Sequence, residues 1–437
     1  MAFNVALHRS TKSGRFLSLL LLATLIVHPV AFAVGADTSL SVYTAFVVYL
    51  FLLGFTIINK KWFVRRSEIL LICIACIGCI IGAATGIQAY GDSGIGSAVG
   101  YLLGLLAILS FGSRLNKADV SLLLYIVMLF GFAAALYAFV FQMPQWVNVL
   151  SGNQAGSNSW RYFSFFGQRN RFAACLYLSI VCGVVLFALT RRKKFAVVVV
   201  FLLFQIIITN SRTALVAALI SVFVFVCFNS KSRLLIGAAS GCAILVAISM
   251  FSEDLGSYLG VFFSHYGGFD SASVRTDMWG YGISELMESG MWLFGFGSGT
   301  QNIALTPYFE VSSFHNMYIE LLFEGGVIKF GSYLVLIASS IYCAKKNEAF
   351  SEWNLFRSLY LPLLISWLAF SVLEAGATPF STTFFSFLMS VLLFILPRCC
   401  SVNVVLEEEL AAGLASADHG DFSEGESKRA VIALCNK

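Results

Sequence analysis

Charged residues are scarce in this chain, and their scarcity excludes a soluble globular domain. Only 12% of the 437 residues are charged, whereas soluble domains carry roughly 25%. Hydrophobic residues make up 59% of the sequence, and the mean hydropathy is +0.84. This composition predicts an all-α membrane protein that crosses the bilayer many times.

The sequence also lacks the features of a disulfide framework or a metal centre. Most of its eleven cysteines lie inside apolar runs, among them Cys73, Cys76 and Cys79 at helical spacing. These three allow two interpretations, a metal triad or small apolar residues packed in a lipid-spanning helix. We favour packing, because no histidine or carboxylate neighbours them in the sequence. The predicted outer intervals hold no acidic cluster with metal-ligand spacing, so we predict neither a metal nor a cofactor.

Apolar runs predict about twelve membrane spans, and no internal repeat relates them. The predicted spans are 16–34, 41–58, 68–86, 98–112, 120–142, 171–190, 195–209, 213–228, 234–251, 327–344, 358–375 and 384–397. The first follows Arg9, Lys12 and Arg15 and ends near the small-residue pattern at 31–33. A cleaved signal peptide and an uncleaved span are both compatible with this pattern. The length of the run and the spans that follow favour an uncleaved span.

Lysine and arginine are concentrated in alternate loops. The basic residues in these loops are Lys60, Lys61, Arg65, Arg66, Arg114, Lys117, Arg191, Arg192, Lys193, Lys194, Lys231, Arg233, Lys345, Lys346 and Arg357. All fall on the cytoplasmic side if the N-terminus is cytoplasmic, as the positive-inside rule requires.

This orientation predicts four parts of the chain. They are N-terminal spans (1–251), a periplasmic loop with interfacial helices (252–316), C-terminal spans (317–400) and a cytoplasmic tail (401–437). The large loop precedes the last three spans. Its segment 284–289 predicts an amphipathic helix at the membrane interface.

Five arginines lie on the predicted outer side, where such residues are normally rare. They are Arg161, Arg169, Arg171, Arg212 and Arg275. A guanidinium at a membrane interface costs free energy unless it is paired, snorkelling or bound to an anion. Ion pairs are one interpretation, because carboxylates are available at Glu253, Asp254, Asp270, Asp277, Glu285 and Glu288. For the group as a whole we favour a site for a lipid-linked phosphate or diphosphate, whose oxygens guanidinium forks match in bidentate geometry.

The chemically capable side chain of segment 312–329, SSFHNMYIELLFEGGVIK, is His315, which Asn316 follows. The segment ends a polar interval and enters an apolar run, so the imidazole is predicted just outside the membrane. Histidine takes or gives a proton near neutral pH, which makes His315 a candidate acid–base group. An ordinary interface histidine is the alternative. The nearby glycine-rich segment 295–299, GFGSG, is interpreted as a tight turn rather than a phosphate-binding loop, because no strand precedes it.

Taken in order, these patches resemble the O-antigen ligase and polymerase superfamily of bacterial inner-membrane glycan transferases. The matching segments are FGQRNRFA (166–173), TNSRTAL (209–215), VRTDMW (274–279), LFGFGSGT (293–300) and SFHNMYIELLFEGGVI (313–328). With the large outer loop, the resemblance extends from about Arg161 to Lys346. The sequence departs from the family's Gly-x-x-Gly pattern, because Gly326 fits the first glycine and Lys329 replaces the second. This departure weakens the expectation of close helix packing more than that of the chemistry.

The resemblance implies a glycosyltransferase that moves a glycan from undecaprenyl diphosphate to an acceptor hydroxyl. It acts without a metal on the periplasmic side of the inner membrane. In this resemblance His315 is the general base, and Arg212 and Arg275, with Arg169 or Arg171, neutralise the diphosphate. Gln168 and Asn316 orient the donor or acceptor, and Arg161 contributes to substrate binding. Membrane lipids are the other expected partners, and no nucleic acid is expected.

The acceptor defines the branches of this superfamily. It is a serine or threonine of a pilin-type protein, the lipid A-core, or the next repeat unit of a polymer. Gln168, in the Gly-Gln-x-Asn order of 167–170, favours the protein-glycosylating branch modestly. A transporter of lipid-linked glycans is the alternative from another class. It predicts arginines throughout a central cavity and an inverted repeat, whereas here the charges collect on one face and no repeat is present.

Overall fold

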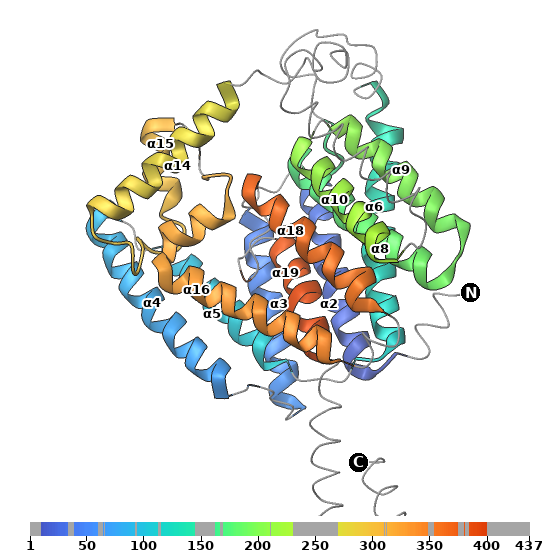
Figure 1. The fold of residues 1–437 in the computed structure, drawn as a ribbon, viewed down its shortest axis with the longest axis horizontal. Coiled ribbons are helices and arrows are strands. Elements are labelled where there is room, and N and C mark those ends of the chain that lie inside the picture. The colour runs from blue at the N-terminus through green and yellow to red at the C-terminus, as the bar shows by residue number, and fades with distance from the viewer. Residues whose placement is uncertain are drawn as a thin grey trace, which may run out of the picture.

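All elements of secondary structure in the part of the chain that the computed structural model describes are helices (Figure 1). That part comprises residues 10–33, 39–59, 64, 66–91, 94–111, 115–144, 162–166, 169–209, 211–229, 270–309, 311, 313–347, 354–374, 380 and 384–399. The helices are Lys12–Ala33 (α2), Ser39–Ile58 (α3), Arg66–Tyr90 (α4), Ile95–Ser110 (α5), Lys117–Phe141 (α6), Arg169–Thr190 (α8), Lys193–Thr209 (α9), Arg212–Asn229 (α10), Asp270–Glu288 (α14), Gln301–Phe309 (α15), Met317–Lys346 (α16), Phe356–Tyr360 (η1, a π-helix), Leu361–Leu373 (α18), Phe384–Ser390 (α19), Val391–Ile395 (η2, a π-helix) and Leu396–Cys399 (α20).

The all-α membrane fold predicted from composition is confirmed. Five described helices are long and apolar enough to cross a bilayer, namely Glu68–Tyr90, Lys117–Phe141, Arg169–Thr190, Met317–Lys346 and Phe356–Leu373. Helices are favoured there because a helix satisfies its own backbone groups inside lipid. The predicted spans coincide with described helices except for 234–251, which lies outside the described residues. The count of twelve stays a prediction.

One span begins earlier than hydropathy predicted. The predicted span 327–344 is the second part of α16, which starts ten residues sooner, at Met317. Hydropathy missed the first part because Glu320 and Glu324 lower its apolar character. Both carboxylates have hydrogen-bonding partners within the protein, Ser313 for Glu320 and Lys329 for Glu324, so the helix tolerates them.

Helix ends that adjoin the basic loops contact one another in two places. Arg398 Nη2 donates to Glu68 Oε2 over 2.8 Å and to the carbonyl of Leu109 over 2.9 Å, joining α20, α4 and α5. Ser358 Oγ donates to Asn229 Oδ1 over 2.6 Å, joining η1 to α10. These contacts agree with the alternation of loops read from the basic residues. Which membrane face they occupy stays a prediction.

The segment that leads into α8 is fixed by buried polar contacts. Gln142 accepts hydrogen bonds from the amides of Phe163 and Ser164 and donates to the Ser164 carbonyl. The Tyr162 hydroxyl donates to Gln205 of α9. Because buried polar groups cost free energy when unpaired, this network holds residues 162–166 in one conformation. These hydrogen bonds therefore fix the segment that precedes the start of α8, where several predicted site residues lie.

Helix α16 is interrupted at Gly326, whose φ of 59° and ψ of −162° are not helical. The segment 292–297 fills the interruption. The amides of Phe296 and Gly297 donate to the carbonyls of Phe323 and Glu324, each over 2.8 Å. In return, the amides at 327 and 328 donate to the carbonyls at 292 and 293. The loop thus supplies the backbone partners that the broken helix lacks.

The glycine-rich segment 295–299 is a turn, as the sequence predicted. Its three glycines have φ values of 69°, 98° and 86°. The amide of Gly297 is bonded to α16, and the Thr85 hydroxyl of α4 donates to the Gly295 carbonyl over 2.7 Å. The amide of Gly299 donates to a carboxylate oxygen of Glu324 over 2.8 Å. Since these amides already have partners, the segment does not present them to a phosphate.

We expect Gly326→Ala to destabilise the protein. The new Cβ would collide with the backbone carbonyl of Leu293, and the positive φ is unfavourable for alanine. A loss of at least about 2 kcal/mol in the free energy of unfolding follows from these two costs. Gly331→Ala, in the same helix with open space around it, is the matched control. Thermal unfolding in detergent should show a lower midpoint for Gly326→Ala alone, and equal midpoints would contradict the helix break.

Candidate functional site

His315 lies in a tight turn immediately before α16. Its φ is 52°, an uncommon value for a residue other than glycine. The turn is held by the His315 amide, which donates to Ser313 Oγ over 3.0 Å, and by Trp279 Nε1, which donates to the Phe314 carbonyl over 2.8 Å. The imidazole remains 34% exposed. A constrained backbone that presents a partly exposed imidazole is typical of a functional residue.

Asn316, predicted to orient the substrate, caps α16. Its side-chain oxygen accepts hydrogen bonds from the amides of Tyr318 and Ile319, over 2.9 and 3.2 Å. The residue is 6% exposed. The cap fixes the position of His315 relative to the helix, because the two residues are adjacent. A direct role in substrate binding stays a prediction.

Among the residues that the structure describes, Glu374 is the carboxylate paired with the imidazole, and sequence reasoning missed it. His315 Nδ1 lies 3.6 Å from Glu374 Oε2 and is a buried atom without a hydrogen-bond partner. The other carboxylate oxygen accepts a hydrogen bond of 2.7 Å from Asn170 Nδ2 at the start of α8. Glu374 follows α18 directly and is 12% exposed. The arrangement orients a carboxylate toward one ring nitrogen and leaves the other nitrogen for a substrate.

Arg275 of α14 reaches the same place. Its Nη1 donates to the carbonyl of Leu373, the residue before Glu374, over 3.4 Å. Arg275 and Trp279 lie one turn apart, so both face the His315 turn. These contacts bring residues of α8, of α14, of the turn before α16 and of the end of α18 to one site.

Two arginines at the start of α8 lie beside this site. Arg169 is exposed, whereas Arg171 is partly buried, and Asn170 between them binds Glu374. Among the residues that the structure describes, Arg169, Arg171 and Arg275 have no ion-pair partner. The described carboxylates that sequence analysis offered as partners, Asp277, Glu285 and Glu288, form no ion pair with them. The side chains of Glu253, Asp254 and Asp270, which sequence analysis also offered as partners, lie outside the described residues.

Arg212 is placed only by its helix. It is the first residue of α10, which packs against α8 and α18. The opposite end of α10, at Asn229, is bonded to Arg357 and Ser358 near the start of α18. Arg212 therefore lies toward the end of α18 that carries Glu374. Arg161 and Gln168 lie outside the described residues.

No metal site is evident in the described part of the chain, where no group of three or more His, Cys, Asp or Glu side chains is placed to hold an ion. Cys73 is exposed, and Cys76 and Cys79 are partly buried along α4. Metal independence stays a prediction.

The fold and site define a helical membrane protein whose cationic, histidine-containing site lies where its helices end. Residues 196–334 match the family model described as O-antigen ligase. The match confirms the resemblance to the O-antigen ligase and polymerase superfamily, and it supports a glycosyltransferase of that type. It includes Arg212, Arg275 and His315. A comparison with curated proteins found no match.

Proposed function

We propose that this protein is an inner-membrane glycosyltransferase that moves a glycan from undecaprenyl diphosphate to an acceptor hydroxyl on the periplasmic side. The observation that carries the proposal is the convergence of His315, Glu374, Asn170 and Arg275 at one point. A proton acceptor beside guanidinium groups suits the attack of a hydroxyl on a sugar that carries a diphosphate.

His315 is proposed as the general base. Nδ1 faces Glu374, so Nε2 would take the proton from the acceptor hydroxyl as its oxygen attacks the anomeric carbon. The bond between that carbon and the diphosphate oxygen breaks, and undecaprenyl diphosphate leaves with the electron pair. Glu374 would stabilise the imidazolium and fix the ring, as the orienting carboxylate of a catalytic triad does. Its 3.6 Å separation from Nδ1 allows closer approach when substrate binds.

The arginines are proposed to stabilise the departing diphosphate. Arg275 donates to the carbonyl of Leu373, next to Glu374. Arg169 and Arg171 lie at the start of α8, and Arg212 is the first residue of α10. Guanidinium groups held in place before the reaction stabilise charge as it develops, which is the role a divalent cation plays elsewhere. This is the basis for proposing a metal-independent reaction. Gln168 and Arg161 are proposed to bind substrate, together with the side-chain amide group of Asn316.

The proposed acceptor is a serine or threonine of a pilin-type protein, on the basis of Gln168. The test is transfer by the purified protein in liposomes that contain an undecaprenyl-diphosphate-linked glycan. Separate reactions receive a pilin-type protein, lipid A-core or no acceptor, all in the presence of EDTA. We expect a mass increase of the pilin-type protein by one glycan, with a rate that EDTA does not change.

Each of the other outcomes would indicate a different activity for this protein. Modified lipid A-core would indicate an O-antigen ligase, and a lengthened donor in the reaction without acceptor would indicate a polymerase. Movement of the intact donor across the bilayer without any transfer would overturn the enzymatic proposal in favour of a transporter. Dependence of the transfer on a divalent cation would contradict the role given to the arginines.

A further inference from the structure

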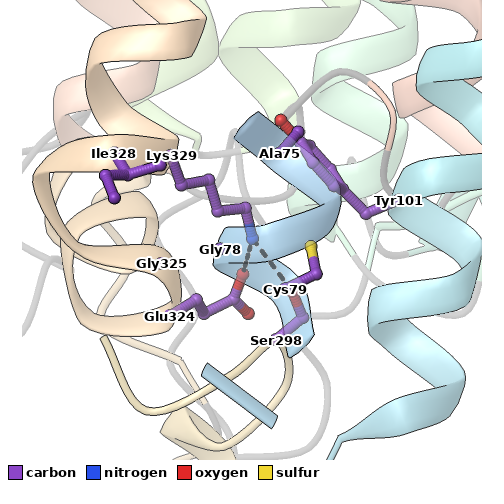
Figure 2. Close-up of a pocket in the computed structure, with 9 residues that line it drawn as sticks. All are labelled: Ala75, Gly78, Cys79, Tyr101, Ser298, Glu324, Gly325, Ile328 and Lys329. Atoms are coloured by element: carbon purple, nitrogen blue, oxygen red, sulfur yellow. Dashed lines mark hydrogen bonds and ion pairs between the residues drawn. The ribbon is translucent and has the colours of Figure 1, made fainter. Parts of the chain in front are cut away.

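A second group of charged side chains is buried on α16, beside the interruption at Gly326. Lys329 and Glu324 of α16 line a small cavity between α4, α5 and the segment 292–300 (Figure 2). Their side chains are 8% and 14% exposed. Lys329 Nζ lies 2.5 Å from Glu324 Oε2, donates to Ser298 Oγ over 3.1 Å and lies 4.7 Å from the centre of the Tyr101 ring. Neither residue takes part in the proposed reaction.

This ion pair spans the interruption of α16. Glu324 precedes Gly326 and Lys329 follows it, so the pair joins the two parts of the helix. Residues five positions apart do not face each other in a regular helix, and the break is what brings the two charges together. Glu324 Oε1 also accepts the amide of Gly299 over 2.8 Å. One buried pair therefore holds the first part of α16, the second part and the loop in a single arrangement.

The energetic character of the pair indicates a geometric role. Burying two charges costs free energy that their attraction repays only with good geometry, so a buried ion pair contributes little net stability. Removing one partner alone is costly, because a buried charge is left without compensation. In some proteins such a pair specifies one conformation rather than stabilising the fold. Here the conformation that it specifies is the bend of α16.

The bend lies between His315 and the part of α16 on which α18 packs. His315 and its cap, Asn316, move with the first part of α16. Glu374 follows α18, which packs on the second part of α16 through the rings of Tyr333 and Trp367, 6.1 Å apart. A change in the bend would move the imidazole relative to the carboxylate. The Tyr318 hydroxyl, which donates to the Leu368 carbonyl over 2.8 Å, limits that movement.

We propose that Lys329 and Glu324 are positioning residues that set the bend of α16 and thereby hold His315 against Glu374. This inference rests on the proposed role of His315 as general base. In this sequence, a charged pair fixes the helix at the position where the superfamily pattern has a second glycine. The pair acts through geometry and does not touch the substrate.

The test compares Lys329→Met with a neutral double variant, Glu324→Gln/Lys329→Gln. The first leaves Glu324 uncompensated, whereas the second removes both charges and keeps groups that can hydrogen-bond to each other. We expect Lys329→Met to lower kcat about tenfold, because small misplacement of a catalytic group is costly, with the KM for donor unchanged. The double variant should recover most of kcat. Lys345→Met, at an exposed lysine of the same helix, is the matched control.

A distance measurement tests the bend without relying on activity. Spin labels are placed at Ser284 of α14 and Val335 in the second part of α16, both exposed, after replacement of the eleven native cysteines. Helix α14 packs on α16, so the label pair reports on the bend. We expect one narrow distance distribution in the parent protein, a broader or shifted one with Lys329→Met, and recovery in the double variant.

The outcomes separate this inference from the proposed function. If the parent protein transfers no glycan, the proposed function fails, and the distance measurement still decides whether the pair sets the bend. An unchanged distance distribution in Lys329→Met overturns the inference, whatever the effect on kcat. If Lys329→Met does not accumulate, Glu324→Gln and the double variant are compared in its place. Equal kcat values and equal distance distributions in these two and the parent protein would overturn the inference.

Discussion

Replacement of His315 by glutamine is expected to lower the rate of glycan transfer by about 10²–10⁴-fold, the usual contribution of a general base. Glutamine can hydrogen-bond but cannot accept a proton near neutral pH. Loss of a hydrogen bond alone would cost about 1 kcal/mol, or roughly fivefold. The two magnitudes distinguish proton transfer from orientation. The measurement is initial rate of acceptor modification at saturating donor, with protein level and donor binding checked in parallel.

Two further variants show whether the effect of His315→Gln is specific to this site. Glu374→Gln keeps an oxygen that can accept from Asn170 but loses the charge facing His315 Nδ1, so we expect a smaller decrease than for His315→Gln. His265→Gln is the control at another histidine of the outer interval, outside the described residues, and should have little effect. If His315→Gln retains most of the rate, His315 is an orienting residue and the arginines carry the catalysis.

Replacement of Arg275 by alanine is expected to lower kcat by about 10²–10³-fold, the cost of removing one preorganised donor from a transition state. Its guanidinium is partly buried and is held by the Leu373 carbonyl next to Glu374. Arg275→Lys keeps the charge but loses the planar fork, and we expect at least about a tenfold decrease. Both rates are measured in liposomes with the same lipid-linked donor.

The matched control is Arg357→Ala, at an exposed arginine next to the opposite end of α18. It should leave kcat unchanged. Full activity in Arg275→Lys would reduce this residue to a point charge. Full activity in Arg275→Ala would remove it from the site, and the diphosphate would then have to be bound by the arginines at the starts of α8 and α10.

The helices could be predicted from the sequence because lipid enforces long apolar runs with paired backbone groups. Arg275 became a candidate because arginine is rare on the side that the basic loops predict to be outer, and His315 became one because imidazole takes or gives a proton near neutral pH. Glu374 was missed because it ends a span without a motif around it. A carboxylate at the end of an apolar helix costs free energy in lipid, and that cost was the available signal. The role of Asn170 was missed because sequence analysis assigned roles to Arg169 and Arg171 on either side of it and none to the asparagine.

The interruption of α16 could not be predicted from hydropathy, which registers composition and not backbone dihedral angles. The adjacent Gly325 and Gly326 were a signal for it, since paired glycines permit a kink. The ion pair between Lys329 and Glu324 could not be predicted from the sequence either. A lysine in an apolar run has no partner at regular helical spacing here, and Glu324 becomes its neighbour only because the helix is broken.

The backbone exchange between α16 and segment 292–297 limits which parts of this protein can be transplanted. Phe296 and Gly297 donate to the helix, and the helix donates back to the loop at 292 and 293. A chimaera could receive the predicted outer loop from a relative but keep its own α16. The backbone groups of the new loop would then not match those of the interrupted helix. Unpaired amides and carbonyls at the edge of the bilayer would then oppose assembly. An exchange of this loop between relatives therefore requires residues 291–300 and 323–329 to be replaced together, although a hydropathy plot assigns them to separate parts of the chain.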